Sequence, residues 1–237
     1  MSVSTARRRR TTPSAGAGAP AEPPKDCDLC PRLVEFRAAN REAAPQWFNG
    51  AVPSFGDEHA RLLIVGLAPG LQGANKTGRP FTGDFAGDLL YATLLKFGFA
   101  EGRYEARPDD GLTLTGAMIT NAVRCVPPQN KPTGPEAKQC RPFLAARIAA
   151  LPRLTTLIAL GRVAHENVLA ALGARKSDHP FAHGARHALV GPEEVGPEGA
   201  SLTLFDSYHC SRYNTNTGRL TPAMFEAVFD AVRRELD

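Results

Sequence analysis

The sequence predicts an α/β sandwich of three layers, in which helices cover both faces of a central, mainly parallel sheet of four strands. Four short apolar runs are bounded by turn residues and have the length of buried parallel strands. Helix-like segments alternate with these runs, which is the pattern of an α/β/α sandwich. The apolar runs are 62–65, 117–123, 157–160 and 202–205, and the helical segments are 87–97, 135–151, 163–172 and 222–236.

Two stretches depart from this simple pattern. Pro135 suits the first turn of a helix, whereas Pro142 is expected to kink or interrupt the turns that follow, because proline has no N–H and its ring clashes with the preceding turn. Residues 174–200 are rich in Gly, Pro and His and have no clear periodicity. We expect them to form a long loop with at most a short hairpin.

The length and composition predict one folded domain and an N-terminal arm. The chain has 237 residues, of which 43% are hydrophobic, so it can bury one sizeable core. Residues 1–25 contain arginines at 7–10 among Pro, Ala, Gly, Ser and Thr. Such a composition buries too little apolar surface to offset the entropy of ordering. We expect a disordered basic arm over 1–25 and a single domain over 26–237.

The net charge of +4 lies entirely in the arm, which has five basic residues and one acidic residue and leaves 23 of each in residues 26–237. Nucleic-acid binding by the domain would therefore depend on how its charges are distributed, and a solubilising arm is the alternative. No run of 18 apolar residues occurs, and no apolar stretch follows the N-terminal arginines. We expect a cytoplasmic protein with no membrane partner.

Four of the five cysteines form two pairs. Cys27 and Cys30 have C-x2-C spacing at the start of a helix, and fourteen residues separate Cys125 from Cys140. C-x2-C spacing presents two thiolates to one metal centre, and disulfides are disfavoured in the cytoplasm. The wide second spacing differs from compact zinc sites without excluding zinc, and buried free thiols are the alternative. Cys210 is unpaired, and we expect a packed thiol there.

The most unusual polar and glycine-rich segments follow three of the predicted strands. They are residues 66–70, 121–125 and 206–216. Ligands of open α/β sheets bind outside the carboxyl ends of the strands. We therefore expect these three segments to converge on one site.

Four motifs along the chain are specific enough to suggest a family. They are G-L-A-P-G at 66–70, G-R-P-F-T-G-D at 78–84, T-N-A-V-R-C at 120–125 and S-Y-H-C-S-R-Y-N-T-N-T-G at 207–218. Together and in this order they resemble the family 5 (B-type) uracil-DNA glycosylases, over the chain from about residue 27 to its end. The resemblance implies the three-layer fold and release of uracil, hypoxanthine and ethenocytosine from DNA, which initiates base excision repair. It also implies a [4Fe-4S] cluster on Cys27, Cys30, Cys125 and Cys140.

An enzyme of this class extrudes the damaged nucleotide and recognises its base in a pocket. Phe81 is expected to stack on the base. The carboxamide of Asn121 offers a donor and an acceptor to uracil O4 and N3–H, although the residue alone would equally suit a cap at the end of a strand. Gly66 and Gly70 would let the backbone approach the nucleotide closely, and Ala68 would leave the pocket apolar.

Cleavage of the N-glycosidic bond leaves negative charge on the base and cationic character on the sugar. His209 is the candidate donor to uracil O2. In other branches of the superfamily, the segment matching 66–70 holds a polar residue that activates water, which Ala68 cannot do. We therefore expect Asp84 to do this work in preference to Asn75, with helix capping as the alternative role of Asp84. His183 is a further residue that could reach the ligand.

The DNA strand is expected to contact the motif at 207–218. The residues assigned to DNA binding are Ser211, Arg212, Asn214 and Asn216. Binding should be salt-sensitive, with double-stranded and also single-stranded DNA as partners and with the protein as a monomer. Two other functions compete with this one: a zinc-containing hydrolase of free nucleosides and a non-catalytic nucleic-acid-binding module.

Overall fold

The computed structural model describes residues 20–191 and 201–237. The expected disorder of the arm over residues 1–19 therefore lies outside the described residues, as does part of the expected loop at 174–200. None of the helices within the described ranges is long and apolar enough to cross a membrane.

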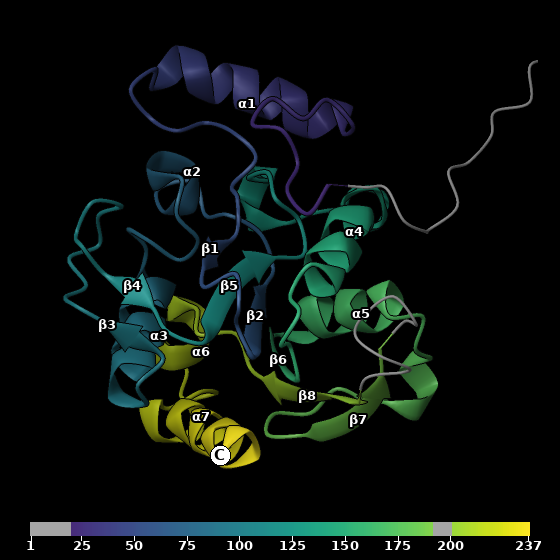
Figure 1. Cartoon of the computed structure of the whole chain (residues 1–237). Helices are drawn as coiled ribbons and strands as arrows, with labels where there is room; N and C mark the ends of the chain where they lie inside the picture. The colour runs from purple at the N-terminus through teal and green to yellow at the C-terminus, as the bar shows by residue number, and fades with distance from the viewer. Residues whose placement is uncertain (1–19, 192–200) are drawn as a thin grey trace, which may run out of the picture.

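The centre of the fold is a six-stranded sheet with the order β1-β5-β2-β6-β8-β7 (Figure 1). Its four inner strands are parallel, and β1 and β7 pair antiparallel at the two edges. From edge to edge, the strands are β1 (Phe55–Gly56), β5 (Ala117–Asn121), β2 (Leu62–Gly66), β6 (Thr156–Leu160), β8 (Ser201–Ser207) and β7 (Arg186–Val190). The predicted fold class is confirmed, but the expected count of four strands omitted both edges.

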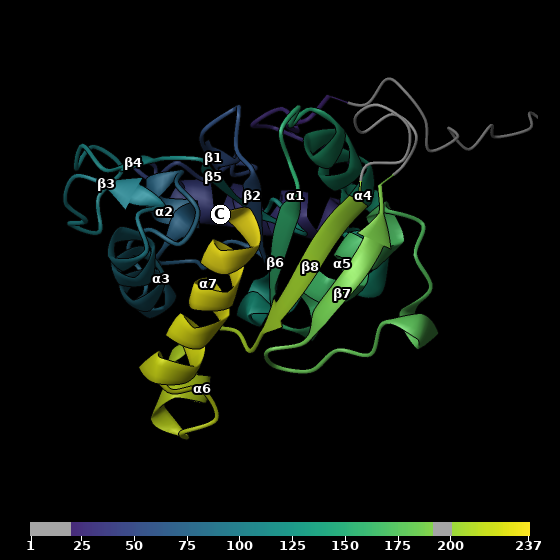
Figure 2. The same cartoon turned by 60° about the horizontal axis from the view of Figure 1, so that its bottom comes forward.

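Helices cover both faces of this sheet, so the three layers are present. α3 and α7 pack on one face, and α4 and α5 pack on the other (Figures 1 and 2). The helices are α1 (Pro31–Ala43), α2 (Ala74–Thr77), α3 (Phe85–Lys96), α4 (Gly134–Ala149), α5 (Arg162–Ala171), α6 (Arg212–Asn216) and α7 (Pro222–Leu236). A small two-stranded sheet, β3 (Ala100–Glu101) with β4 (Thr113–Leu114), lies beside α3.

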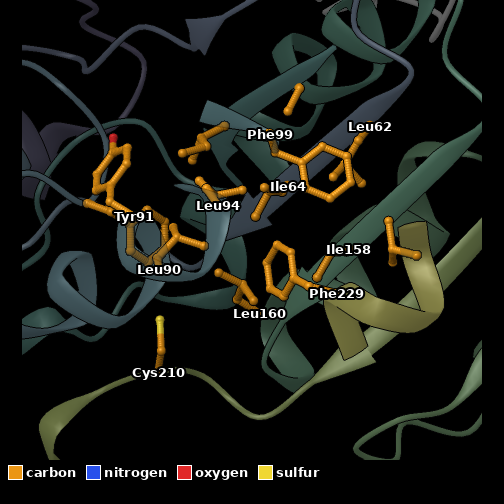
Figure 3. Close-up of a cluster of buried hydrophobic side chains, with 14 of the residues drawn as sticks. Leu62, Ile64, Leu90, Tyr91, Leu94, Phe99, Ile158, Leu160, Cys210 and Phe229 are labelled. Atoms are coloured by element: carbon orange, nitrogen blue, oxygen red, sulfur yellow. The ribbon is translucent and has the colours of Figure 1, made fainter. Parts of the chain in front are cut away.

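Successive residues of each inner strand enter different cores, because side chains alternate across a sheet. On β2, Leu62 and Ile64 belong to the core under α3 and α7, whereas Leu63 and Val65 belong to the core under α4 and α5. Figure 3 shows the first core, with Ile64 and Ile158 of the sheet close to Phe229 of α7. Burial on both faces explains why the inner strands are continuous apolar runs.

The helix α4 starts where the sequence predicts and continues through its internal proline. Thr133 and Glu136 form a reciprocal capping box, with the Glu136 N–H donating to Thr133 Oγ1 at 3.4 Å and the Thr133 N–H donating to Glu136 Oε2 at 2.7 Å. The expected interruption at Pro142 was wrong, since α4 is continuous through this residue. Phe143, Leu144 and Ile148 are buried beyond it, and this packing outweighs the lost backbone hydrogen bond.

The folded part of the chain begins earlier than the expected boundary at residue 26. Glu22 accepts hydrogen bonds from the Ser54 N–H at 3.0 Å, from Arg124 Nη1 at 2.7 Å and from Arg147 Nε at 3.0 Å. Burial alone would raise the pKa of Glu22, but Arg124 and the hydrogen bonds from Ser54 hold it below its ordinary value. Composition could not reveal this contact, since it depends on two buried arginines far along the chain.

Candidate active site

The ends of β2 and β5 place two of the predicted site residues side by side. Gly66 and Asn121 are register partners in the parallel pair. A Cβ atom at residue 66 would lie 2.4 Å from Asn121 Oδ1 and 2.6 Å from Phe81 Cζ. Only glycine fits there, so the absence of a side chain brings the carboxamide and the aromatic ring together.

Asn121 has an unsatisfied acceptor at this point. The residue is 2% exposed, and its Oδ1 has no hydrogen-bond partner among the described residues. A buried polar atom left unpaired costs about 1–3 kcal/mol. A ligand that donates a hydrogen bond would therefore gain a ready partner at Asn121.

Phe81 is held in a conformation that large side chains seldom adopt. Its φ is +53°, in the left-handed region, and the residue is 6% exposed. The carbonyl of Phe81 accepts a hydrogen bond from the Tyr104 hydroxyl at 3.2 Å, and the ring stacks on that of His209, with centroids 5.9 Å apart and an interplanar angle of 28°. Such strain persists only where the surroundings define the conformation.

His209 follows the end of β8 and is half-buried. Burial lowers the pKa of His209 to about 4, so the imidazole is neutral at neutral pH. Its carbonyl accepts a hydrogen bond from Asn214 Nδ2 at 2.8 Å, which anchors the backbone of the loop. The site therefore contains a neutral N–H donor beside the ring of Phe81.

Asp84 has two differently used carboxylate oxygens. Its Oδ1 accepts from the Gly87 N–H at 3.1 Å and caps α3, as the alternative role for this residue required. Its Oδ2 faces the glycine-rich segment, since a Cβ at Gly70 or Gly73 would lie 3.0 or 2.4 Å from it. Burial raises the pKa of Asp84, and the hydrogen bond from the Gly87 N–H only partly opposes this. Capping thus uses Oδ1, while Oδ2 faces the glycine-rich segment.

Asn75 and Ala68 lie in structural contacts: Asn75 is hydrogen-bonded and Ala68 packs against apolar side chains. Asn75 is fully buried, and its Nδ2 donates to Asn49 Oδ1 at 2.9 Å while its backbone N–H donates to the Gly70 carbonyl at 3.0 Å. Asn75 therefore braces the segment that starts at Gly70. Ala68 packs against the apolar group around Cys125, so it connects the glycine-rich segment to the cysteines.

The predicted DNA-binding residues all lie in or next to α6, which projects beyond the start of α7 (Figure 2). Ser211 Oγ caps this helix by accepting from the Asn214 N–H at 3.4 Å. The guanidinium of Arg212 lies 5.3 Å from the centroid of the Phe85 ring. Asn216 is the last residue of α6. Ser211 and Asn214 therefore already shape the segment that positions His209.

A cleft opens beside His209. Its lining residues are Gly161, Arg162, Phe181, Ala182, Tyr208, His209, Asn214 and Arg219. Gly161 and Arg162 were not among the site residues predicted from the sequence, although they follow β6 just as Leu67 and Ala68 follow β2, and the same rule for parallel strands predicts them. His183 contacts Tyr208, which lines the cleft, and its Nδ1 accepts from the Tyr208 N–H at 3.1 Å.

The four paired cysteines line one pocket. Its lining residues are Pro23, Cys27, Leu29, Cys30, Leu33, Val123, Arg124, Cys125, Gln139, Cys140 and Phe143. Two nitrogen donors point at sulfur: Arg37 Nη1 lies 3.7 Å from Cys125 Sγ, and the Arg124 N–H lies 3.4 Å from Cys140 Sγ. Burial raises the pKa of Cys125 to about 12 and that of Cys140 to about 11. The pocket thus gathers four thiols with donors suited to charged sulfur.

Cys210 lies elsewhere, as expected for a packed thiol. It is fully buried in the core under α3 and α7, and its Sγ donates to the Ala86 carbonyl at 3.4 Å (Figure 3).

The site combines a buried carboxamide with an unpaired acceptor, an aromatic ring and a neutral imidazole at the carboxyl edge of a parallel sheet. This set of groups is typical of proteins that take up a small planar polar group such as a nucleobase. The chain belongs to the uracil DNA glycosylase superfamily, whose family model matches residues 53–233. Within this superfamily it belongs to the type-5 branch.

Three relatives illustrate this membership, each named a type-5 uracil-DNA glycosylase. The chain is 46% identical to the protein of Thermus thermophilus over 214 residues, which cover 88% of this chain and 93% of that protein. It is 39% identical to the protein of Mycobacterium tuberculosis over 216 residues, or 88% and 77% of the two chains. It is 37% identical to the protein of Pyrobaculum aerophilum over 213 residues, or 88% and 87%.

Proposed function

We propose that the protein is a DNA glycosylase that releases uracil from DNA by hydrolysis, with hypoxanthine and ethenocytosine as further substrates, and so initiates base excision repair. The observation that carries the proposal is the unpaired Oδ1 of Asn121, buried next to Phe81 at a position that only Gly66 leaves open. The names of the type-5 relatives support the same activity.

Base recognition follows from the two kinds of polar atom on one carboxamide. Asn121 Oδ1 accepts the N3–H of an extruded uracil, and Nδ2 donates to its O4. Thymine differs from uracil by a methyl group. Cytosine presents the inverse pattern of donor and acceptor at this edge. Phe81 supplies the stacking surface that replaces the neighbouring bases.

Bond cleavage is assisted at both ends of the bond that breaks. As the bond between the base nitrogen and C1′ breaks, negative charge develops on the base, and neutral His209 donates a hydrogen bond to O2. Asp84 Oδ2 stabilises the cationic sugar and accepts a proton from the water that adds to C1′. The base leaves with both bonding electrons and later takes up a proton.

DNA contacts surround this pocket. Ser211 and Asn214 shape α6, while Arg212 and Asn216 meet the strand on its outer surface. Arg162 and Arg219 line the cleft beside His209 and add positive charge for the phosphates. These contacts suit double-stranded and single-stranded DNA bound by a monomer. The cytoplasmic location stays a prediction from the sequence.

We propose further that Cys27, Cys30, Cys125 and Cys140 hold a [4Fe-4S] cluster. In the described part of the chain, the only group of metal-ligand side chains whose ligand atoms lie within 4.8 Å of one another is His165, His187 and Asp206. The thiols share a pocket but are spread more widely, whereas four thiolates on one zinc lie roughly 3.8 Å apart at a Zn–S distance of ~2.3 Å. When bound, the cluster would supply a covalent link between the segment before α1 and the β5–α4 region, and no step of the hydrolysis needs it.

The decisive experiment measures release of the free base from matched duplexes that contain uracil, hypoxanthine or ethenocytosine, under single-turnover conditions. The wild-type protein should release uracil, and Asn121→Ala should lose about 1–3 kcal/mol of discrimination, seen as a drop of roughly 5- to 150-fold. Activity on free deoxyuridine with none on DNA would support a nucleosidase instead. Binding of DNA without base release would support a non-catalytic module.

The cofactor is tested separately, by metal analysis and visible absorption after anaerobic purification. Iron and sulfide near four atoms each per chain, with broad brown absorption, is the expected result. Stoichiometric zinc without iron would reject the cluster and leave the proposed activity untouched.

A further inference from the structure

Behind the cleft lies a buried group of three side chains from three elements: His165 of α5, His187 of β7 and Asp206 of β8. Their side chains are 2%, 9% and 0% exposed. Asp206 Oδ1 lies 2.7 Å from His165 Nδ1, and Asp206 Oδ2 lies 2.9 Å from His187 Nε2. Each carboxylate oxygen therefore meets a different histidine.

The second ring nitrogen of His165 decides the proton count. His165 Nε2 lies 2.9 Å from the His179 carbonyl, which can only accept a hydrogen bond, so Nε2 carries a proton. The Nδ1 atom then faces a carboxylate, which also accepts when ionised. His165 lies between two acceptors, and a neutral imidazole can satisfy only one of them. A second proton therefore lies between His165 Nδ1 and the Asp206 carboxylate.

His165 and Asp206 hold the loop at 179–185, which lines part of the cleft, against the sheet. The His165 ring holds the His179 carbonyl and packs edge-on against Phe181, with centroids 5.5 Å apart. Phe181 lines the cleft and lies under the guanidinium of Arg162, 5.3 Å from its ring centroid. Two backbone hydrogen bonds join the same loop to Asp206: the Gly184 N–H donates to its carbonyl at 2.8 Å, and its N–H donates to the Ala185 carbonyl at 2.9 Å.

The group is also connected to the segment that carries His209. Asp206 is three residues before His209, and the His165 N–H donates at 3.1 Å to the carbonyl of Gly161, which lines the cleft. A Cβ at Gly161 would lie 3.5 Å from His209 Cβ. A shift of the loop or of the first turn of α5 would consequently move the backbone that lies beside the Cβ atom of His209.

We infer that His165 is an imidazolium, paired with the Asp206 carboxylate and supported by His187, and that this triad is the positioning device for the loop that orients His209. A carboxylate that receives N–H donors on both oxygens is stabilised in its ionised form, so the proton belongs to the histidine. The charge state stands on the hydrogen bonds alone, whereas the effect on turnover rests on the function proposed above.

A divalent cation is the competing occupant, since the three ligand atoms lie within 4.8 Å of one another. A metal would take the place of the proton, with His165 Nε2–H still held by the His179 carbonyl. The separate contact of each carboxylate oxygen with its own histidine, at hydrogen-bond length, favours the proton.

The first test is the protonation state of His165 in the full-length holoenzyme, measured by nitrogen-15 NMR of the histidine rings at neutral pH. Both ring nitrogens of His165 should carry protons. In Asp206→Asn the carboxamide can donate to Nδ1, so His165 should become neutral and keep only its Nε2 proton. A neutral His165 in the wild type, or zinc at one ion per chain that His187→Ala removes, would overturn the proposal.

The second test separates positioning from folding. His165→Leu should slow single-turnover release of uracil roughly 10- to 100-fold, with the Kd for DNA changed less than about twofold, because misplacement of about 1 Å has such an effect on chemistry. His165→Gln, which keeps one N–H donor, should lie between this variant and the wild type. Circular dichroism identifies any variant that fails to fold. If His165→Leu does not fold, the rate of His165→Gln tests the positioning role.

The matched control is Arg186→Gln, which removes a side chain adjacent to His187 on β7 that pairs instead with Glu235. It should leave the rate unchanged. A wild-type rate in both folded His165 variants contradicts the positioning role. A wild-type enzyme that releases no uracil contradicts the proposed function, while the NMR result still decides the charge state of the triad.

Discussion

Two buried polar regions of this molecule differ in how fully they are satisfied. In the first, Arg79 donates with both Nη atoms to Asp110 at 2.7 Å and with Nε to Thr82 Oγ1 at 2.7 Å. Asp110 also accepts the N–H groups of Glu105 and Leu112. In the second, around Asn121, the acceptor Oδ1 is buried without a partner among the described residues.

The difference separates polar groups that hold the fold from those that await a ligand. A bidentate pair with every atom bonded leaves nothing for a ligand to gain, and it contributes only while both members are present. An unpaired acceptor weakens the folded state slightly and favours whatever can donate to it. We therefore expect substitutions in the first region to change stability and those in the second to change turnover.

The largest expected effect is on folding. Asp110→Asn should lower the free energy of unfolding by about 3–5 kcal/mol, because it leaves the buried guanidinium of Arg79 without its counter-charge. Urea denaturation measures this. The control is Asp109→Asn, whose side chain is 78% exposed, and it should change stability by less than about 0.5 kcal/mol. Equal losses in the two variants would show that the first region is not the structural one.

The next effect is on the rate. His209→Ala and Asp84→Asn should each slow single-turnover release of uracil by about 10²- to 10³-fold, with DNA binding nearly unchanged. The loss from Asp84→Asn should be equal for every base, because its target is the sugar, whereas the loss from His209→Ala should be smaller for hypoxanthine. Asp88→Asn, on the exposed side of α3, is the control for Asp84. Near-wild-type turnover in Asp84→Asn would remove the carboxylate from the mechanism.

The pH dependence gives a smaller effect with a defined sign. Burial raises the pKa of Asp84 above its ordinary 3.8, and the ionised form is the active one. Activity should therefore fall along an acidic limb as the pH drops through the raised pKa of Asp84, while His209, whose pKa is lowered to about 4, is neutral at neutral pH. Single-turnover rates from about pH 4.5 to 8 measure this. The limb should vanish in Asp84→Asn, and a limb that persists there belongs to another group.

The smallest effect concerns the arm. Removing residues 1–19 deletes four arginines and should flatten the dependence of log K on log[salt] by up to roughly 3.6, if every arginine contacts a phosphate at ~0.9 each. Turnover at saturating DNA should be unchanged. Removal of residues 1–25 should also destabilise the fold, because it takes away Glu22. An unchanged salt slope after the shorter deletion would show that the arm does not bind DNA.

Most of the fold was predictable because the four parallel strands are buried on both faces. The predicted segment at 62–65 matches β2, observed at Leu62–Gly66, since only a continuous apolar run can occupy that place. The edge strand β7 escaped prediction because Leu189 is the only buried hydrophobic residue among its five, so its apolar alternation is barely visible. The continuity of α4 through Pro142 was also not predictable, because it depends on packing against residues far along the chain.

The site was predictable to the extent that its residues belong to recognisable motifs. Asn121 and Phe81 both lie close to Gly66, whereas the partnership of His165 with Asp206 spans 41 residues and has no motif. In the sequence, His165 and His187 could only be expected to be surface or core residues. The role of His165 and Asp206 follows from their hydrogen-bond geometry, which a sequence pattern does not contain.

The contact of Glu22 with Arg147 has a consequence for the protein during its synthesis. The two residues are 125 positions apart, so on a ribosome that adds about 5–20 residues each second, Glu22 waits roughly 6–25 s for its partner. Cys27 and Cys30 emerge within the same interval, before Cys125 and Cys140 have been translated. During those seconds the first two thiols have no cysteine partners from the second pair.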